Sequence, residues 1–294
     1  MKTRAYLYIV SGAALWGLIG FFVKAIAAQG FTALQIVALR MLAASICVTP
    51  IVYHQDKNNF KIALKDLWMF IGTGVISLTF FNYCYFNCIQ ASSLAVAALL
   101  LYTAPVFVML MSLVLFKERF TITKGIALAA TFLGCGLVTG AFSGELKLSV
   151  AGILLGLGSG IGYALYSIFG KFALEKYSSW TITAYTFYFA FISSAAIADF
   201  PHCTAVWSSA TVTGSLGLGF ICDVFPYLLY TKGLQYVDAG QASILATVEP
   251  VVAALVGIFV FAEPLDWPKL AGIFLVLGSV AALNLPNNPQ NKGE

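Results

Sequence analysis

A long stretch without charge constrains this chain most strongly. From residue 67 to residue 116 the sequence contains no Asp, Glu, Lys or Arg. A helix needs about 20 apolar residues to cross the hydrocarbon core of a bilayer, so this stretch accommodates two spans joined by a tight turn. The chain is 60% hydrophobic and only 10% charged, whereas charged residues make up about a quarter of an ordinary soluble protein. The sequence therefore predicts an integral membrane protein.

Further uncharged runs predict an all-α membrane protein with ten transmembrane helices. A β-barrel is excluded because the runs lack the alternation of apolar and polar residues that barrel strands show. The expected spans are 5–28, 32–53, 67–89, 92–116, 121–141, 150–172, 178–200, 210–233, 239–261 and 267–285. The connections between them are too short for a folded domain, so we expect the function to lie within the bilayer.

The Lys and Arg residues predict the orientation, because cytoplasmic loops carry an excess of both. If the N-terminus is inside, one face holds only Lys24, Lys147 and Lys269. The other face then holds Lys2, Arg4, Lys57, Lys61, Lys65, Lys117, Arg119, Lys124, Lys171, Lys176, Lys232 and Lys292. We therefore expect a multi-pass protein of the cell (plasma or inner) membrane with both termini in the cytoplasm. The net charge of +4 reflects this bias and does not indicate a nucleic-acid partner.

An internal repeat relates the two halves of the chain. Segment 85–118 matches segment 230–263, about 145 positions later, and Pro105 and Pro250 occupy the same place in each copy. Five spans per half is an odd number, so the second copy crosses the membrane in the opposite direction. Inverted repeats of this kind are typical of secondary transporters. We expect the repeats at 1–142 and 143–286, followed by a cytoplasmic tail at 287–294.

The matched prolines lie inside the fourth and ninth expected spans. A proline within a helix removes one backbone hydrogen bond and tends to kink the helix. In a bilayer the freed carbonyl needs a partner or a water-lined cavity. Pro105 and Pro250 therefore predict two helix kinks beside a central cavity.

These features together resemble the EamA family of the drug/metabolite transporter superfamily. The resemblance rests on the ten spans, the five-plus-five repeat, the triplets Thr103-Ala104-Pro105 and Val248-Glu249-Pro250, and the matched Glu118 and Glu263. It covers about residues 5–285. The resemblance implies a similar role to bacterial exporters of amino acids and other small metabolites. One departure is that Ala104 stands where the second copy has Glu249, so any role of that carboxylate belongs to one half.

Three charged residues inside the expected spans break the repeat. Asp223 stands where the first copy has Leu78, and Glu249 stands where it has Ala104. Arg40 has only uncharged residues near its counterpart in the second copy, around Phe187. A charge at mid-bilayer costs roughly 2.5–3.5 kcal/mol on insertion scales, so it normally faces a cavity or a partner. Asp223 and Glu249 are candidate substrate or proton-coupling sites, with a structural role as the alternative. Arg40 either receives a substrate carboxylate or pairs with one of the two acids, which leaves one carboxylate over.

Polar and aromatic side chains supply a second set of candidate substrate-binding residues. They are Trp16, Asn82, Tyr85, Tyr102, Tyr163, Tyr227 and Tyr230. The alternative for each aromatic residue is helix packing or a place in the belts at the membrane interfaces. Lys24 and Lys171 follow matched spans, and we expect each to reach an interface with its ammonium group. For Glu118 and Glu263 we expect a structural role, paired with Arg119 or another loop cation, with gating as the alternative.

The sequence favours a transporter over other classes of membrane protein. It contains no metalloprotease motif, no nucleophile with a matched base and no phosphate-binding loop of an ATPase. His54 and His202 lie in different loops, so we expect neither a metal site nor a cofactor. The first hypothesis is a secondary transporter, in particular an exporter of small metabolites such as amino acids, that works by alternating access with or without proton coupling.

The alternatives are a facilitator, an exporter of organic cations, drugs or nucleosides and, in another class, a membrane enzyme or a receptor. The expected partners are a small-molecule substrate, a proton and the lipid bilayer. We expect a monomer, with a dimer as the alternative.

Overall fold

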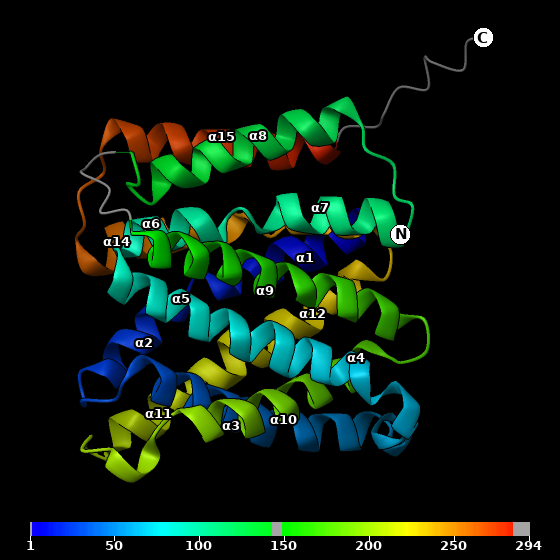
Figure 1. Ribbon diagram of the computed structural model, residues 1–294, viewed down its shortest axis with the longest axis vertical. Coiled ribbons are helices and arrows are strands. Elements are labelled where there is room, and N and C mark those ends of the chain that lie inside the picture. The colour runs from blue at the N-terminus through cyan, green and yellow to red at the C-terminus, as the bar shows by residue number, and fades with distance from the viewer. Residues whose placement is uncertain (1, 143–148, 285–294) are drawn as a thin grey trace.

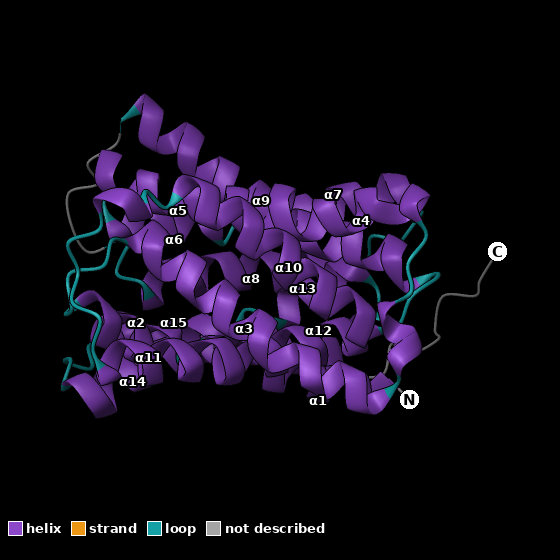
Figure 2. Ribbon diagram, turned by 90° about the horizontal axis from the view of Figure 1, so that it is seen from below, coloured by secondary structure: helices purple, strands orange, loops and turns teal. Residues whose placement is uncertain are grey.

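The computed structural model describes residues 2–142 and 149–284, and in these residues every regular element is a helix. The helices run side by side along one direction (Figure 1), and the loops gather at the two ends of the bundle (Figure 2). Eight helices are long and apolar enough to cross a membrane, and Ile122–Val138 and Trp267–Leu283 are shorter apolar helices. The predicted ten-span membrane fold is therefore confirmed.

The first half contains five spans. The first and the fourth are each divided into two helices, and the third contains a π-helical segment. The spans are α1 (Lys2–Trp16) with α2 (Ile19–Ala27); α3 (Ala33–Gln55); α4 (Leu67–Ile71), η3 (Gly72–Thr79) and α5 (Phe80–Ala91); α6 (Leu94–Leu101) with α7 (Ala104–Leu115); and α8 (Ile122–Val138). The short helices η1 (Lys57–Phe60) and η2 (Leu64–Asp66) join the second span to the third.

The second half repeats this order. Its spans are α9 (Val150–Leu174); α10 (Ser179–Ile197); α11 (Ser209–Gly217), η5 (Leu218–Val224) and α12 (Phe225–Leu234); α13 (Ala239–Leu245) with α14 (Val248–Phe261); and α15 (Trp267–Asn284). The short helix η4 (Phe200–His202) follows α10. Helix α1 begins and α15 ends at the same end of the bundle (Figure 1). We call this end the terminal face and the opposite end the distal face. The expected tail at 287–294 lies outside the described residues.

Hydroxyl side chains at the span boundaries explain where many of the helices begin. Six N-cap side chains accept a hydrogen bond from a backbone N–H in the first turn: Thr32, Ser93, Thr121, Ser149, Ser178 and Ser208. Such bonds satisfy donors that have no partner inside the helix. Apolar runs bounded by these residues therefore fold into helices of defined length.

The third and eighth spans contain π-helical turns at matched positions, η3 and η5. A glycine in each lets another helix approach closely. A Cβ atom on Gly74 would lie 2.6 Å from the carbonyl oxygen of Thr186, and one on Gly219 would lie 2.6 Å from the backbone nitrogen of Ala44. These contacts pack η3 against α10 and η5 against α3.

The fourth and ninth spans are interrupted at the matched prolines. Helix α6 ends at Leu101 and α7 begins at Ala104, so Pro105 stands in a first helical turn, where a backbone N–H is not needed. Pro250 occupies the same place in α14. The expected kinks are therefore breaks between two helices. Each break brings the following turn, which includes Glu249 in the second copy, to the middle of the bundle.

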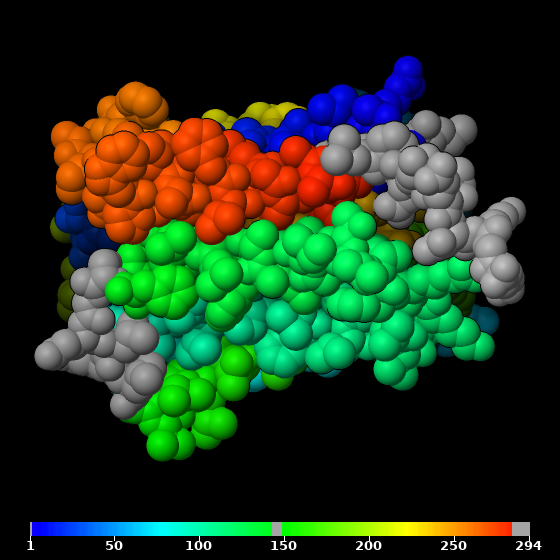
Figure 3. Space-filling view, turned by 90° about the horizontal axis from the view of Figure 1, so that it is seen from above, coloured from blue at the N-terminus to red at the C-terminus, as the bar shows by residue number. Residues whose placement is uncertain are grey.

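Helices α8 and α15 lie side by side on the outside of the bundle (Figure 3). The hydroxyl groups of Thr131 and Ser279 lie 2.8 Å apart between them. A Cβ atom on Gly272 would lie 2.6 Å from the carbonyl oxygen of Gly134, so this pair of helices also packs through small residues. Neither α8 nor α15 lines the central cavity of the bundle.

Candidate functional site

A central cavity of about 390 Å³ lies between the two repeats. Helices α1, α2, α3, α5, α6, α9, α12 and α14 contribute to its wall. Eight of the ten side chains predicted to bind substrate line it: Trp16, Arg40, Asn82, Tyr85, Tyr102, Tyr163, Tyr227 and Glu249. The structure thus brings together residues that are more than 230 positions apart in the sequence.

The cavity extends to the distal face. Lys24, near the end of α2, and Leu94, the first residue of α6, both line it. A second cavity of about 580 Å³ shares Leu94 and Tyr102 with the first and reaches Glu263 and Lys269 at the distal face. In the part of the chain that the structure describes, the central cavity is therefore open on the distal side.

Two of the three charges that break the repeat form a buried ion pair. Arg40 Nη2 lies 3.0 Å from Asp223 Oδ1, with side-chain exposures of 7% and 0%. Arg40 also lines the cavity, whereas the fully buried Asp223 does not. Asp223 is therefore a partner of Arg40 and lies away from the cavity surface. The attraction offsets the cost of removing both ions from water, a cost of several kcal/mol per ion.

Glu249 is the carboxylate that this pairing leaves over. It stands in the first turn of α14, where the helix dipole favours a negative charge. The Tyr163 hydroxyl donates a hydrogen bond to its Oε2 at 3.1 Å. Among the described residues, Glu249 has no ion-pair partner. It therefore presents to the cavity a carboxylate whose one recorded side-chain partner is a hydroxyl.

Aromatic rings form the inner end of the cavity. The Trp16 ring centroid lies 6.3 Å from that of Tyr163, 5.0 Å from that of Tyr227 and 5.4 Å from that of Tyr230. Trp16 and Tyr163 are repeat counterparts, so the pseudo-two-fold axis passes close to this contact. Within the described part of the chain, the buried Trp16 Nε1 has no hydrogen-bond partner, so one donor remains for a bound molecule.

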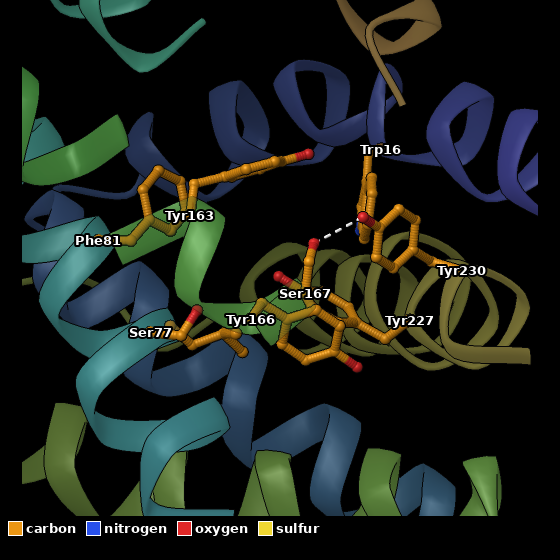
Figure 4. Close-up of a pocket in the computed structure, with 9 residues that line it drawn as sticks. Trp16, Ser77, Phe81, Tyr163, Tyr166, Ser167, Tyr227 and Tyr230 are labelled. Atoms are coloured by element: carbon orange, nitrogen blue, oxygen red, sulfur yellow. Dashed lines mark hydrogen bonds between the residues drawn. The ribbon is translucent and has the colours of Figure 1, made fainter. Parts of the chain in front are cut away.

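Hydrogen bonds between helices seal the inner end on the side of the terminal face. The Ser167 and Tyr230 hydroxyls lie 2.7 Å apart (Figure 4), and those of Tyr166 and Thr231 lie 2.6 Å apart. Tyr230 was a candidate substrate-binding residue, but it does not line the central cavity. It lines a small pocket that adjoins the central cavity. These bonds join α9 to α12 and close the route to the terminal face.

Sequence reasoning missed several lining residues. Phe81 and Phe86 on α5 face the cavity, but an apolar aromatic residue in an apolar span carries no signal that separates a cavity from lipid. Lys24 was expected to reach an interface; its Nζ lies 3.5 Å from the Phe261 ring centroid at the cavity mouth. No group of three or more His, Cys, Asp or Glu residues that could hold a metal ion occurs in the part of the chain that the structure describes.

A ten-span bundle of two repeats, with a central cavity open to one face, defines a membrane transporter. The profile of the EamA-like transporter family matches residues 3–140 and 150–285, so the chain belongs to this family. It is accordingly a transporter and not an enzyme, as the sequence predicted.

The relatives carry similar descriptions. An uncharacterized transporter of Archaeoglobus fulgidus is 33% identical over 272 residues, which cover 92% of this chain and 93% of that protein. The uncharacterized inner membrane transporter YicL of Salmonella typhimurium is 26% identical, with 96% and 95% covered. The uncharacterized transporter YwfM of Bacillus subtilis is 24% identical, with 100% and 98% covered.

A solved crystal structure has the same fold. It superposes with a TM-score of 0.84 at 16% identity and covers 97% of this chain and 98% of that one. The family and the relatives together establish a multi-pass membrane transporter of a small molecule. The orientation of the termini and the division of the chain at residue 142 stay predictions.

Proposed function

We propose that this chain is a secondary transporter that exports small metabolites bearing an amino group, such as amino acids, by alternating access and in exchange for protons. The observation that supports this most directly is the charge pattern of the cavity. Arg40 is neutralised by Asp223 at 3.0 Å, whereas Glu249 faces the cavity with only a hydroxyl partner. A carboxylate in such a site favours a cationic group on the ligand.

The ring system suits the rest of such a ligand. The rings of Trp16, Tyr163 and Tyr227 stand close to one another beside Glu249. An ammonium group near aromatic faces gains cation–π attraction in addition to the ion pair. The same rings offer apolar contact to an aliphatic or aromatic side chain. For an amino acid, Lys24 on the cavity wall is available to the substrate carboxylate.

Proton exchange follows from the cost of an uncompensated charge in the membrane. Glu249 is neutralised either by the ammonium group of a substrate or by a proton. Because the two occupants exclude each other at one carboxylate, movement of one in each direction across the membrane gives antiport. The Tyr163 hydroxyl is placed to hold the carboxylate in position while the occupants exchange.

The predicted orientation assigns the state of the transport cycle that the structure shows. With both termini in the cytoplasm, the distal face is the outer side of the membrane. The structure then corresponds to a state that is open outward and closed toward the cytoplasm. In an exporter this is the state that releases substrate and takes up a proton.

Ligand-induced thermal stabilisation of the purified protein tests the substrate class, because a bound ligand raises the apparent stability of the folded state. We expect amino acids or amines to raise Tm. Analogues whose amino group is acylated or replaced by a hydroxyl, and which therefore lack the ammonium charge, should not raise it. Glu249→Gln should remove the effect, whereas Glu175→Gln, at an exposed site outside the cavity, should retain it. Equal stabilisation of Glu249→Gln by the same amines would contradict the proposal. Stabilisation by amines that lack a carboxylate, but not by amino acids, would favour an organic cation.

A further inference from the structure

A carboxylate closes the terminal face of the bundle. Glu118, in the loop after α7, forms an ion pair with Lys171 near the end of α9. The same carboxylate accepts hydrogen bonds from the backbone N–H of Ala239 at 2.8 Å and of Gly240 at 3.3 Å, at the start of α13. Its side chain is only 8% exposed. Glu118 thus ties the first repeat to two helices of the second.

Glu118 pairs with a different cation from the one expected from the sequence. Arg119 or another loop cation was expected to pair with Glu118, and Lys171 was expected to reach the interface. Instead, the two side chains meet across the boundary between the repeats, close to the Phe116 ring, whose centroid lies 5.3 Å from Lys171 Nζ.

The distal face carries the same residue types at the repeat positions, but there they are apart. The counterparts of Glu118, Lys171 and Phe116 are Glu263, Lys24 and Phe261. Lys24 lies over the Phe261 ring, but Glu263 binds Lys269 at 3.3 Å and its side chain is 47% exposed. The positions that match Ala239 and Gly240 are Leu94 and Ala95 at the start of α6, where the cavity is open.

The backbone around the two glutamates is nevertheless alike. The preceding residues, Lys117 and Ala262, both adopt a left-handed conformation, with φ of 54° and 55°. The N–H of Glu118 bonds to the carbonyl of Ser112 at 3.3 Å, and that of Glu263 to the carbonyl of Gly257 at 3.0 Å. The two loops therefore differ in the partner of the carboxylate and not in local fold.

A further lysine lies in the first turns of the helix that follows each glutamate. Lys269 holds Glu263 and also donates to the carbonyl of Pro264 at 3.2 Å. Its repeat counterpart, Lys124, donates to the carbonyl of Arg119, the position that matches Pro264, at 3.0 Å and binds Asp238 at 2.7 Å. Each glutamate thus has one lysine across the boundary between the repeats and another in its own repeat.

We propose that Glu118 and Glu263 are the two gating residues of the transport cycle and that each exchanges between these two kinds of partner. In the closed position a glutamate binds the lysine of the other repeat and the backbone N–H groups at the start of a helix of the other repeat, α13 for Glu118 and α6 for Glu263. In the open position it binds the lysine of its own repeat. Closing the distal face moves Glu263 from Lys269 to Lys24 and α6, and opening the terminal face moves Glu118 from Lys171 and α13 to Lys124.

This inference rests on alternating access in the proposed function and adds the contacts that hold each face shut. Each glutamate keeps a lysine partner in both positions, so the exchange does not leave its charge unpaired; on the terminal face Lys124 leaves Asp238 for Glu118. Loss of the Glu118 carboxylate removes the ion pair and the two backbone hydrogen bonds of the terminal gate together. Loss of the Glu263 carboxylate removes the ion pair with Lys269 seen here, but in the closed position it removes an ion pair and backbone hydrogen bonds together. The larger loss falls on the closed position, so the state seen here is favoured.

Distances between spin labels test the gates without any substrate. The six free cysteines of the described residues are first replaced. One label pair is placed at the exposed Phe120 and Tyr236 on the terminal face, and another at the exposed Ala91 and Leu265 on the distal face. Pulsed electron paramagnetic resonance then reports the distance distribution of each pair.

We expect Glu118→Gln to shift the terminal pair to longer distances and the distal pair to shorter ones. Lys171→Gln should do the same, which guards against an effect of one substitution on folding. Glu263→Gln should leave the terminal pair at its short distance, and the control Glu175→Gln should change neither pair. An unchanged terminal pair in both Glu118→Gln and Lys171→Gln would overturn the gate, as would equal shifts in Glu118→Gln and Glu263→Gln.

The result separates the gate from the proposed substrate. Opposite responses of the two glutamates, without stabilisation by any amine, would support the gate and contradict the substrate class. Amine-dependent transport with no response of the terminal pair would support the function and contradict the gate.

Discussion

The Arg40 guanidinium lies 3.0 Å from the fully buried Asp223 carboxylate. In the other half of the repeat, the residues at the matched positions are apolar: Leu78 against Asp223 and, near the position of Arg40, Phe187. Both apolar residues are buried in the main core. The duplicated scaffold therefore accepts an apolar pair where the other half carries an ion pair. This asymmetry leaves Glu249 as the cavity carboxylate on which the proposed function depends.

Breaking the Arg40–Asp223 pair should destabilise the protein strongly. We expect Asp223→Asn to cost about 3–5 kcal/mol of unfolding free energy, because removing one partner leaves the other charge buried and uncompensated. The double variant Arg40→Met with Asp223→Leu should recover most of this loss, since a leucine occupies the matched site. Denaturant unfolding of Arg40→Met, Asp223→Leu and the double variant gives the coupling energy. Additive losses would contradict the pairing.

Tyr163→Phe should weaken ligand binding while leaving the fold intact. It removes the hydroxyl that donates to Glu249 at 3.1 Å but keeps the ring contacts. A hydrogen bond to a charged group contributes about 1.5–3 kcal/mol, so we expect at least a tenfold rise in the Kd of an amine ligand. Titration calorimetry measures this Kd, and Tm of the unliganded variant serves as the control. An unchanged Kd would show that the hydroxyl does not position the carboxylate.

The repeated glycines of the π-helical turns should not tolerate a methyl group. Gly74→Ala and Gly219→Ala each place a Cβ atom 2.6 Å from a backbone atom of another helix, and such overpacking costs about 1–3 kcal/mol. We expect both variants to lower Tm. The matched control is Gly278→Ala on α15, where a Cβ atom meets nothing within 4 Å and the gain in helix propensity is about 1 kcal/mol. If Gly74→Ala and Gly219→Ala change the stability in the same way as Gly278→Ala, close packing is refuted.

His202 should titrate above its ordinary range because Asp199 stands beside it. The ring Nδ1 lies 2.6 Å from Asp199 Oδ1, and this hydrogen bond raises the pKa of His202 above 6.5. The pair therefore stabilises the fold fully below pH 6.5, and this contribution disappears as pH rises through the raised pKa. In a nuclear magnetic resonance titration, Asp199→Asn should lower the pKa of His202. A His202 pKa that does not respond to this substitution would contradict the contact.

The sequence contains enough information to place the spans and most of the cavity wall. Charge-free runs locate helices in a bilayer because charges are costly there, and capping residues such as Thr32 and Ser178 mark their beginnings. Polar and aromatic residues within spans, such as Asn82 and Tyr102, turned out to line the cavity because few other surfaces of the bundle can accommodate them.

The remaining features depend on packing across the repeats, which no local pattern encodes. The π-helical turns have no composition of their own, and the prolines indicated a disturbed helix without showing that it breaks into two. The depth of Asp223 behind the wall follows from its contact with Arg40 on another helix. The repeat pairs Glu118 with Glu263, but only the three-dimensional structure shows which of the two is engaged with the other half.

Proton-driven flux in reconstituted liposomes tests the central claim most directly. Wild-type protein should move an amine or amino acid against its gradient when a pH gradient is imposed, and proton movement in the opposite direction should accompany it. Glu249→Gln should abolish the response to the pH gradient, while Glu175→Gln should retain it. Full gradient-driven flux in Glu249→Gln would contradict the claim that this carboxylate exchanges substrate for proton.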